Sequence, residues 1–156
     1  MHAVSTELRP LVEAFARRLS ALPEPAFSVS RAPGKWSQKE VIGHLVDSAQ
    51  NNIRRMIVGQ YEQSPPRIVY RQEEWVRASD WQAMPGKEVI ELWRLLNLQF
   101  CQILDQMPTS TLNLLCDTGQ SEPKLHSLDW IARDYVRHLK HHLNQVLPGS
   151  FDVHYP

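Results

Sequence analysis

The segment "HLKHHLNQ" near the C-terminal end places three histidines within five positions. Imidazole binds divalent metals readily, so this spacing could serve a metal site. Each residue of a helix advances about 100° around the helix axis. Leu128 and Val146 mark the centre of the buried stripe predicted for this segment. His142 lies about 40° from that centre and His138 about 80°, whereas His141 lies about 140° away. His138 and His142 therefore share one edge of the buried face, and His141 points to solvent.

Two histidines four positions apart can bind one ion, but a complete site needs a ligand from elsewhere. His44 is the best candidate, because it lies on the apolar stripe of another predicted helix. Of the other histidines, His2 and His154 lie near the ends of the chain and His126 lies in a predicted loop. Unrelated core or surface histidines remain the alternative explanation, because His-x-x-x-His also occurs on helices by chance.

Polar residues continue along the same helix after His44, in "GHLVDSAQNN". Asp47 and Asn51 extend a polar edge into the bundle, where unpaired polar groups are costly. Asp47 is the first candidate for an acid or base. A salt bridge, or a hydrogen bond that orients a metal ligand, explains a carboxylate at this position equally well. Gly43 indicates a close approach to the helix backbone, either by a functional group or by simple helix packing.

Apolar residues recurring every three or four positions predict four helices. "SQKE" begins the second with a capping box between Ser37 and Glu40. The four predicted helices run from Leu8 to Leu19, from Ser37 to Gly59, from Gly86 to Met107, and from Ser127 to Val146.

These helices, with no convincing alternating strands, predict an all-α four-helix bundle over residues 1–156 as a single domain. The link over residues 59–84 is longer than antiparallel neighbours require, so it favours an up-down-down-up order in which the second and third helices are parallel. The link should also pack as an ordered cover, because it is rich in aromatic side chains: Tyr61, Tyr70, Trp75 and Trp81.

The composition argues against several classes of partner. Lysine plus arginine equals aspartate plus glutamate, 17 of each, so no excess of positive charge is available for nucleic acid or an anionic membrane. The chain has no apolar run of membrane-spanning length and no signal peptide, which predicts a cytoplasmic protein. Cys101 and Cys116 fit no metal or disulfide spacing and are expected to be small apolar core residues.

Three segments together resemble the DinB/YfiT-like superfamily of metal-dependent enzymes, which includes bacillithiol-type S-transferases. They are "GKWSQKEVIGHLVDSAQNN", "VYRQEEWV" and "LDWIARDYVRHLKHHLNQV". The resemblance implies a four-helix bundle that holds one divalent ion on His44, His138 and His142. Other positions that fit the pattern of the superfamily are Trp36, Asp47, Ser48, Asn51, Tyr70 and Trp75.

Three imidazoles leave open positions on an ion, as in a catalytic site. Zinc and nickel are the first candidates, and iron and manganese also fit. The predicted function is a thiol-dependent S-transferase acting on a small molecule with a low-molecular-weight thiol, or a hydrolase. Asp47 and Asn51 are the predicted catalytic residues, and Tyr70 and Trp75 either shape the mouth of the site or anchor the link. A peptidase mechanism of the His-Glu-x-x-His type would lack its usual base, because Leu139 follows His138. The alternative is a non-catalytic, stress-related metal-binding module or a scaffold that forms a homodimer.

Overall fold

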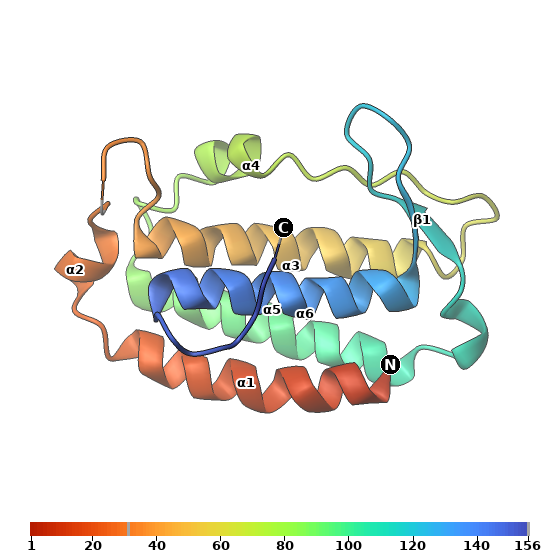
Figure 1. The fold of residues 1–156 in the computed structure, drawn as a ribbon, viewed down its shortest axis with the longest axis horizontal. Coiled ribbons are helices and arrows are strands. Elements are labelled where there is room, and N and C mark those ends of the chain that lie inside the picture. The colour runs from red at the N-terminus through yellow and green to blue at the C-terminus, as the bar shows by residue number, and fades with distance from the viewer. Residues whose placement is uncertain (31, 156) are drawn as a thin grey trace.

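Four long helices form the body of the molecule in the computed structural model, which describes residues 1–30 and 32–155 (Figure 1). Each of them coincides with a segment whose apolar spacing predicts a helix. The first begins six residues earlier than predicted, and buried Val4 and Ser5 account for the added turns. The helices are α1 (His2–Ser20), α3 (Gln38–Val58), α5 (Gly86–Gln106) and α6 (Leu128–Val146).

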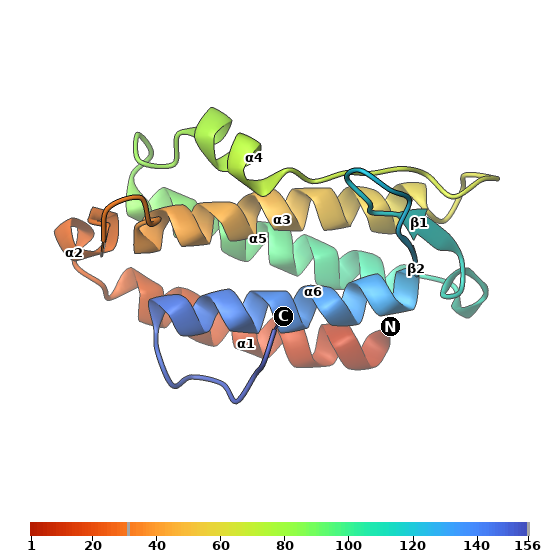
Figure 2. The ribbon, with the colours of Figure 1, turned by 45° about the horizontal axis from the view of Figure 1, so that its top comes forward.

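The order of the helices confirms the predicted up-down-down-up bundle. In Figure 1, α3 and α5 run in the same direction, and α1 and α6 run in the opposite one. Helix α5 packs against α1 and α3, and α3 also packs against α6. Two helices in succession can be parallel only if the link between them returns the chain along the bundle. Figure 2 shows this link passing alongside α3, with the short helix α4 (Gln72–Ser79) inside it.

Local hydrogen bonds fix the start of the two helices that carry the candidate site. At α3, the backbone N–H of Glu40 donates to Ser37 Oγ at 3.1 Å, and the N–H of Ser37 donates to Glu40 Oε2 at 2.8 Å. This is the predicted capping box. At α6, the N–H of Trp130 donates to Ser127 Oγ at 3.2 Å. The register of both helices, and so the direction of their histidines, is set at these caps.

One short pair of strands was not predicted from the sequence. A two-stranded antiparallel ribbon pairs Cys116 with His126, and Asp117 holds its turn by accepting from the N–H groups of Gly119 (2.9 Å) and Lys124 (2.7 Å). Strands of three residues are too short to show alternation. Besides α4, the elements that were not predicted are α2 (Glu24–Ser28), η1 (Thr109–Thr111), β1 (Leu115–Asp117) and β2 (Leu125–Ser127).

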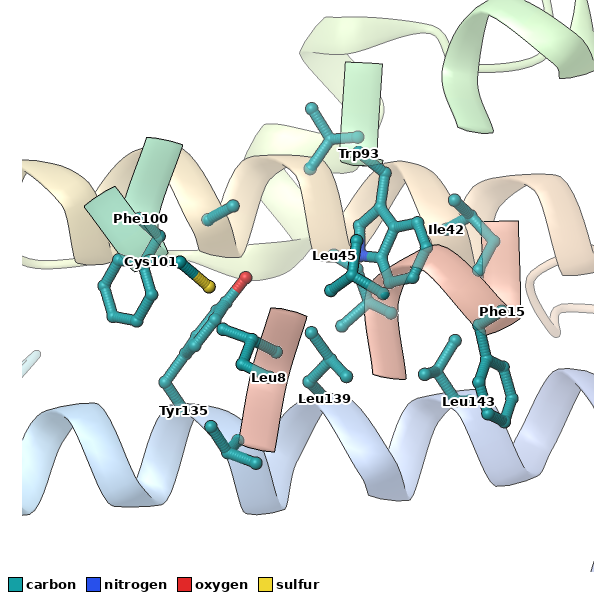
Figure 3. Packing of buried hydrophobic residues seen from close by; sticks show 14 of the residues in the cluster. Leu8, Phe15, Ile42, Leu45, Trp93, Phe100, Cys101, Tyr135, Leu139 and Leu143 are labelled. Atoms are coloured by element: carbon teal, nitrogen blue, oxygen red, sulfur yellow. The ribbon is translucent and has the colours of Figure 1, made fainter. Parts of the chain in front are cut away.

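The core lies where the four helices meet, and Figure 3 shows part of it. Side chains from all four helices interdigitate there: Leu8, Phe15, Ile42, Leu45, Trp93, Phe100, Leu139 and Leu143. Tyr135 is also buried, and its hydroxyl donates to Asn97 Oδ1 at 2.6 Å. Cys101 and Cys116 are free and buried, as predicted.

The link covers α3 with only part of its aromatic surface. Trp81 is 5 % exposed, and Tyr70 is partly buried. Tyr61 is 65 % exposed and Trp75 is 36 % exposed, so the cover predicted from the sequence leaves these two rings partly in solvent. Among residues 1–30 and 32–155, no helix has the length and apolar character needed to cross a membrane.

Candidate metal centre

The three histidines selected from the sequence meet between α3 and α6. His44 is completely buried, whereas His138 and His142 are partly buried. One ring nitrogen of each lies within 4.8 Å of the corresponding nitrogens of the other two. His141 is not part of this group; its Nε2 lies 3.1 Å from Nε2 of Gln145.

The spacing of the ring nitrogens fits a divalent ion. Nε2 of His44 lies 3.2 Å from Nε2 of His138. Two imidazole nitrogens at the usual Zn–N distance of about 2.0–2.1 Å and a tetrahedral angle would be separated by about 3.3 Å. The separation in the protein is therefore close to what such an ion requires.

Tyr70 fixes the orientation of His44. Its hydroxyl oxygen lies 2.7 Å from Nδ1 of His44, and its O–H donates to the carbonyl oxygen of His44 at 3.3 Å. With that proton directed to the carbonyl, the hydroxyl oxygen accepts from an N–H at Nδ1. His44 then carries its proton on Nδ1 and presents the lone pair of Nε2 to an ion.

Gln145 fixes the orientation of His142 in the way that Tyr70 fixes that of His44. Its Oε1 lies 2.9 Å from Nδ1 of His142, which places a proton on Nδ1 and leaves Nε2 free to bind. Gln145 is not among the site residues predicted from the sequence. Its place three positions after His142 on one helix face is the signal that could have indicated it.

Burial keeps the three imidazoles neutral. Desolvation, and then the positive charge that His142 would carry, lower the pKa of His44 from 6.5 to about 3. Desolvation also lowers the pKa of His142 to about 4 and that of His138 well below its ordinary value. All three rings therefore have lone pairs available at neutral pH, which metal binding requires.

Asp47 is buried beside this group, but its partners come from the link. Trp81 Nε1 donates to Oδ2 at 3.1 Å, and the hydroxyl of Ser79 donates to Oδ1 at 3.3 Å. No ion pair among residues 1–30 and 32–155 includes Asp47, so the salt-bridge explanation is wrong for the described structure. Burial raises its pKa to about 6. The amide of Asn51 donates to the backbone carbonyl of Asp47 at 2.9 Å.

Gly43 explains how Trp81 reaches Asp47. A Cβ at position 43 would lie only 2.2 Å from Cγ of the Trp81 ring, so the indole packs directly on the helix backbone. The close approach predicted at Gly43 therefore comes from an aromatic residue of the link.

Two cavities flank the histidines. One of about 660 Å³ is lined by His138 and Tyr70, and one of about 470 Å³ is lined by His142 and Trp36. Gln72, at the start of α4, lines both. Small molecules can thus approach the group from two sides.

The sequence is similar to those of known proteins over most of its length. A family model described as the DinB superfamily matches residues 8–146. A protein of Geobacillus thermodenitrificans (strain NG80-2) named "Putative metal-dependent hydrolase" is 23 % identical over 141 residues, which cover 90 % of this chain and 78 % of the relative. A protein of the same description from Oceanobacillus iheyensis is 26 % identical over 144 residues, 90 % of this chain and 80 % of the relative.

Two solved structures share the fold. YfiT from Bacillus subtilis, described as "a probable metal-dependent hydrolase with an unusual four-helix bundle topology", superposes with a TM-score of 0.77 at 18 % identity, over 94 % of this chain and 81 % of YfiT. A mycothiol-dependent maleylpyruvate isomerase superposes with a TM-score of 0.68 at 14 % identity, over 90 % of this chain and 58 % of the isomerase. At these identities the likeness shows the fold alone.

Proposed function

The chain belongs to the DinB superfamily, and we propose that it is a metal-dependent enzyme whose ion is bound by His44, His138 and His142. The observation that carries this proposal is the convergence of three neutral imidazoles in a site with a cavity on either side. Three protein ligands leave positions on an ion open to water or substrate, which distinguishes catalytic from structural sites.

The donor set favours zinc or nickel, and iron and manganese also accept imidazole with water. When bound, such an ion would lower the pKa of a thiol or water molecule that it coordinates. The protein contributes the rest: Tyr70 and Gln145 hold two of the rings with Nε2 directed inward.

Thiol-dependent transfer is the reaction that the two cavities favour. A transfer has two substrates, and the cavities on the His138 side and the His142 side provide a place for each. We propose a low-molecular-weight thiol, such as bacillithiol, and a small electrophile. The sulfur lone pair would form the new C–S bond while the leaving group departs with its bonding electrons and takes up the thiol proton. The thiol-dependent reaction named for the isomerase of similar fold supports this proposal.

Hydrolysis is the second candidate, because the similar relatives are named as hydrolases. Water must then lose a proton, and we propose Asp47 as the acceptor. A group with a pKa of about 6 is well matched to proton transfer near neutral pH. Trp81 and Ser79 would hold the carboxylate in place, and Asn51 would position this stretch of α3 or the substrate.

The test begins with elemental analysis of protein purified without a metal-affinity tag. We expect one divalent ion per chain in the wild type and in the His141→Ala control, and none in the alanine variants of His44, His138 and His142. Full metal content in His142→Ala would refute the ligand assignment. Thiol consumption is then measured with bacillithiol and a chromogenic aromatic halide, and ester and lactone hydrolysis is measured in parallel, with His138→Ala as the blank. Metal binding without either activity would favour the non-catalytic metal-binding module.

Three expectations remain predictions: that residues 1–156 form one domain, that the protein is cytoplasmic, and that it forms a homodimer. Limited proteolysis tests the first, fractionation of the source cells the second and analytical ultracentrifugation the third. A monomer at micromolar concentration would contradict the homodimer.

A further inference from the structure

Arg55 is a buried cation that forms no ion pair in the described part of the chain, although the carboxylate of Asp134 exerts a weaker attraction on it. Its side chain extends from α3 and is only 9 % exposed. No ion pair among residues 1–30 and 32–155 includes it. Lys39, a second buried cation, shows the usual arrangement: its ammonium group lies 2.8 Å from Glu24 Oε1. An unpaired buried charge is costly, so its presence in a fold calls for an explanation.

The hydrogen bonds of Arg55 leave part of the guanidinium group unused. Nε and Nη2 donate to the carbonyl oxygen of Ile68 at 3.2 and 2.9 Å, and Nη1 donates to Asn52 Oδ1 at 3.3 Å. These bonds use one N–H on each nitrogen. A guanidinium group has a second N–H on each Nη, and these two have no acceptor in the described structure. Paired N–H groups of this kind bind carboxylate and phosphate oxygens.

Arg55 lines the cavity that also contains His138 and Tyr70. Lys124 and Arg137 line the same cavity, and neither takes part in an ion pair in the described structure. Asp134 is the carboxylate in the lining, and its Oδ2 already accepts from the hydroxyl of Tyr155 at 2.9 Å. Among the described residues that line it, the cavity therefore carries more positive than negative side chains beside the candidate metal centre.

We infer that this cavity binds the anionic group of the substrate, a carboxylate or a phosphate, through Arg55 with Lys124 and Arg137. The inference rests on the proposed function, because it assigns the end of the substrate that lies away from the histidines. His44 and Arg55 are eleven positions apart on α3, about 16 Å along the helix axis. The guanidinium group of Arg55 donates to Asn52, one turn closer to His44. The substrate is thus an elongated small molecule with its reactive group at the histidines and its negative charge several bonds away.

The test uses succinate and inorganic phosphate as probes and succinamide as the uncharged counterpart of succinate. Binding is measured by calorimetry on metal-free protein, so that no ion can hold the anion. We expect the wild type to bind one of the two anions, the tighter one identifying the group, and to bind succinamide much more weakly. Arg55→Gln should weaken anion binding about ten-fold or more, because it removes hydrogen bonds to a charged group. Arg54→Gln, at the exposed neighbouring position, is the matched control and should bind as the wild type does.

Arg55 also holds the link through Ile68, so Arg55→Gln could lose stability. The double variant Lys124→Gln, Arg137→Gln changes only exposed side chains and should also weaken anion binding while the melting temperature is kept. Failure of the wild type to bind either anion more tightly than succinamide, or unchanged anion affinity in the folded variants, would overturn the inference. Metal content is measured on the same protein preparations before the metal is removed for calorimetry. Normal metal binding without anion binding refutes the anion site alone, whereas absence of metal from the wild type refutes the proposed function.

Discussion

The hydroxyl oxygen of Tyr70 lies 2.7 Å from Nδ1 of His44, so a residue of the long link holds a ring that belongs to α3. Groups that orient metal-binding histidines in this way typically contribute 10- to 100-fold to metal affinity. We therefore expect Tyr70→Phe to weaken zinc binding about 10- to 100-fold in competition with a chromogenic chelator. The fold should be retained, because phenylalanine keeps the ring and its contact with Trp75.

Tyr61→Phe is the control for this variant, because Tyr61 belongs to the same link and is 65 % exposed. Its metal affinity should match that of the wild type. If Tyr70→Phe binds zinc as tightly as Tyr61→Phe does, the hydroxyl does not orient His44 for an ion.

Gly43→Ala should destabilise the protein. The added methyl group would lie 2.2 Å from Cγ of the buried Trp81 ring, which packs against α3 and cannot move without losing contacts. Overpacking of this kind costs about 1–3 kcal/mol of unfolding free energy, which urea denaturation measures.

In a Trp81→Ala background, the effect of Gly43→Ala on the free energy of unfolding should have the opposite sign. Without the indole, alanine at position 43 meets no ring and gains about 1 kcal/mol over glycine in a helix interior. The same Gly43→Ala change should then stabilise the protein. Equal destabilisation in both backgrounds would show that another group restricts position 43.

Asp47 should make the stability of the metal-free protein depend on pH. Burial raises its pKa from 3.8 to about 6, so the folded protein holds this proton more tightly than the unfolded chain does. Raising the pH from 4 to 7 forces a charge on the buried carboxyl group and lowers the free energy of unfolding. A shift of about two units corresponds to about 3 kcal/mol. The stability of Asp47→Asn relative to the wild type should therefore rise by up to about 3 kcal/mol between pH 4 and pH 7.

The difference between variant and wild type isolates Asp47 from the histidines, which titrate in both proteins. Asp152→Asn, which changes an exposed carboxylate, should show a nearly constant difference over the same range. If the free energies of unfolding of Asp47→Asn and the wild type change with pH in parallel, the pKa of Asp47 is not raised by folding.

The bundle could be predicted because its determinants are local and periodic. The caps at Ser37 and Ser127 and the apolar stripes set the helices, and the helix geometry alone separated His138 and His142 from His141. The length of the link then selected the parallel pair α3 and α5, because only a long connection can return along the bundle.

The surroundings of the site could not be predicted in the same way. Tyr70 and Trp81 reach α3 through a link with no periodic pattern, and their hydrogen-bond partners depend on the path that the link follows. The three-residue strands are too short to leave a signal, yet their ribbon brings Lys124 to the cavity of Arg55. Contacts of this kind are fixed by tertiary packing and become visible only in three dimensions.

Removal of the metal should lower the melting temperature without unfolding the protein. The ion would join α3 to α6 through His44, His138 and His142, and it would bind the folded chain far better than the unfolded one. At a free metal concentration 1,000 times the dissociation constant, the stabilisation is about 4 kcal/mol, or about 10 °C for a domain of this size. Far-UV circular dichroism of the chelated protein should still show a helical fold, because four apolar faces form a core without the ion. Chelation should lower the melting temperature of His141→Ala as much as that of the wild type. It should leave the melting temperature of His138→Ala unchanged. An unchanged melting transition in the wild type, after metal removal is verified by elemental analysis, would show that the ion does not join the two helices.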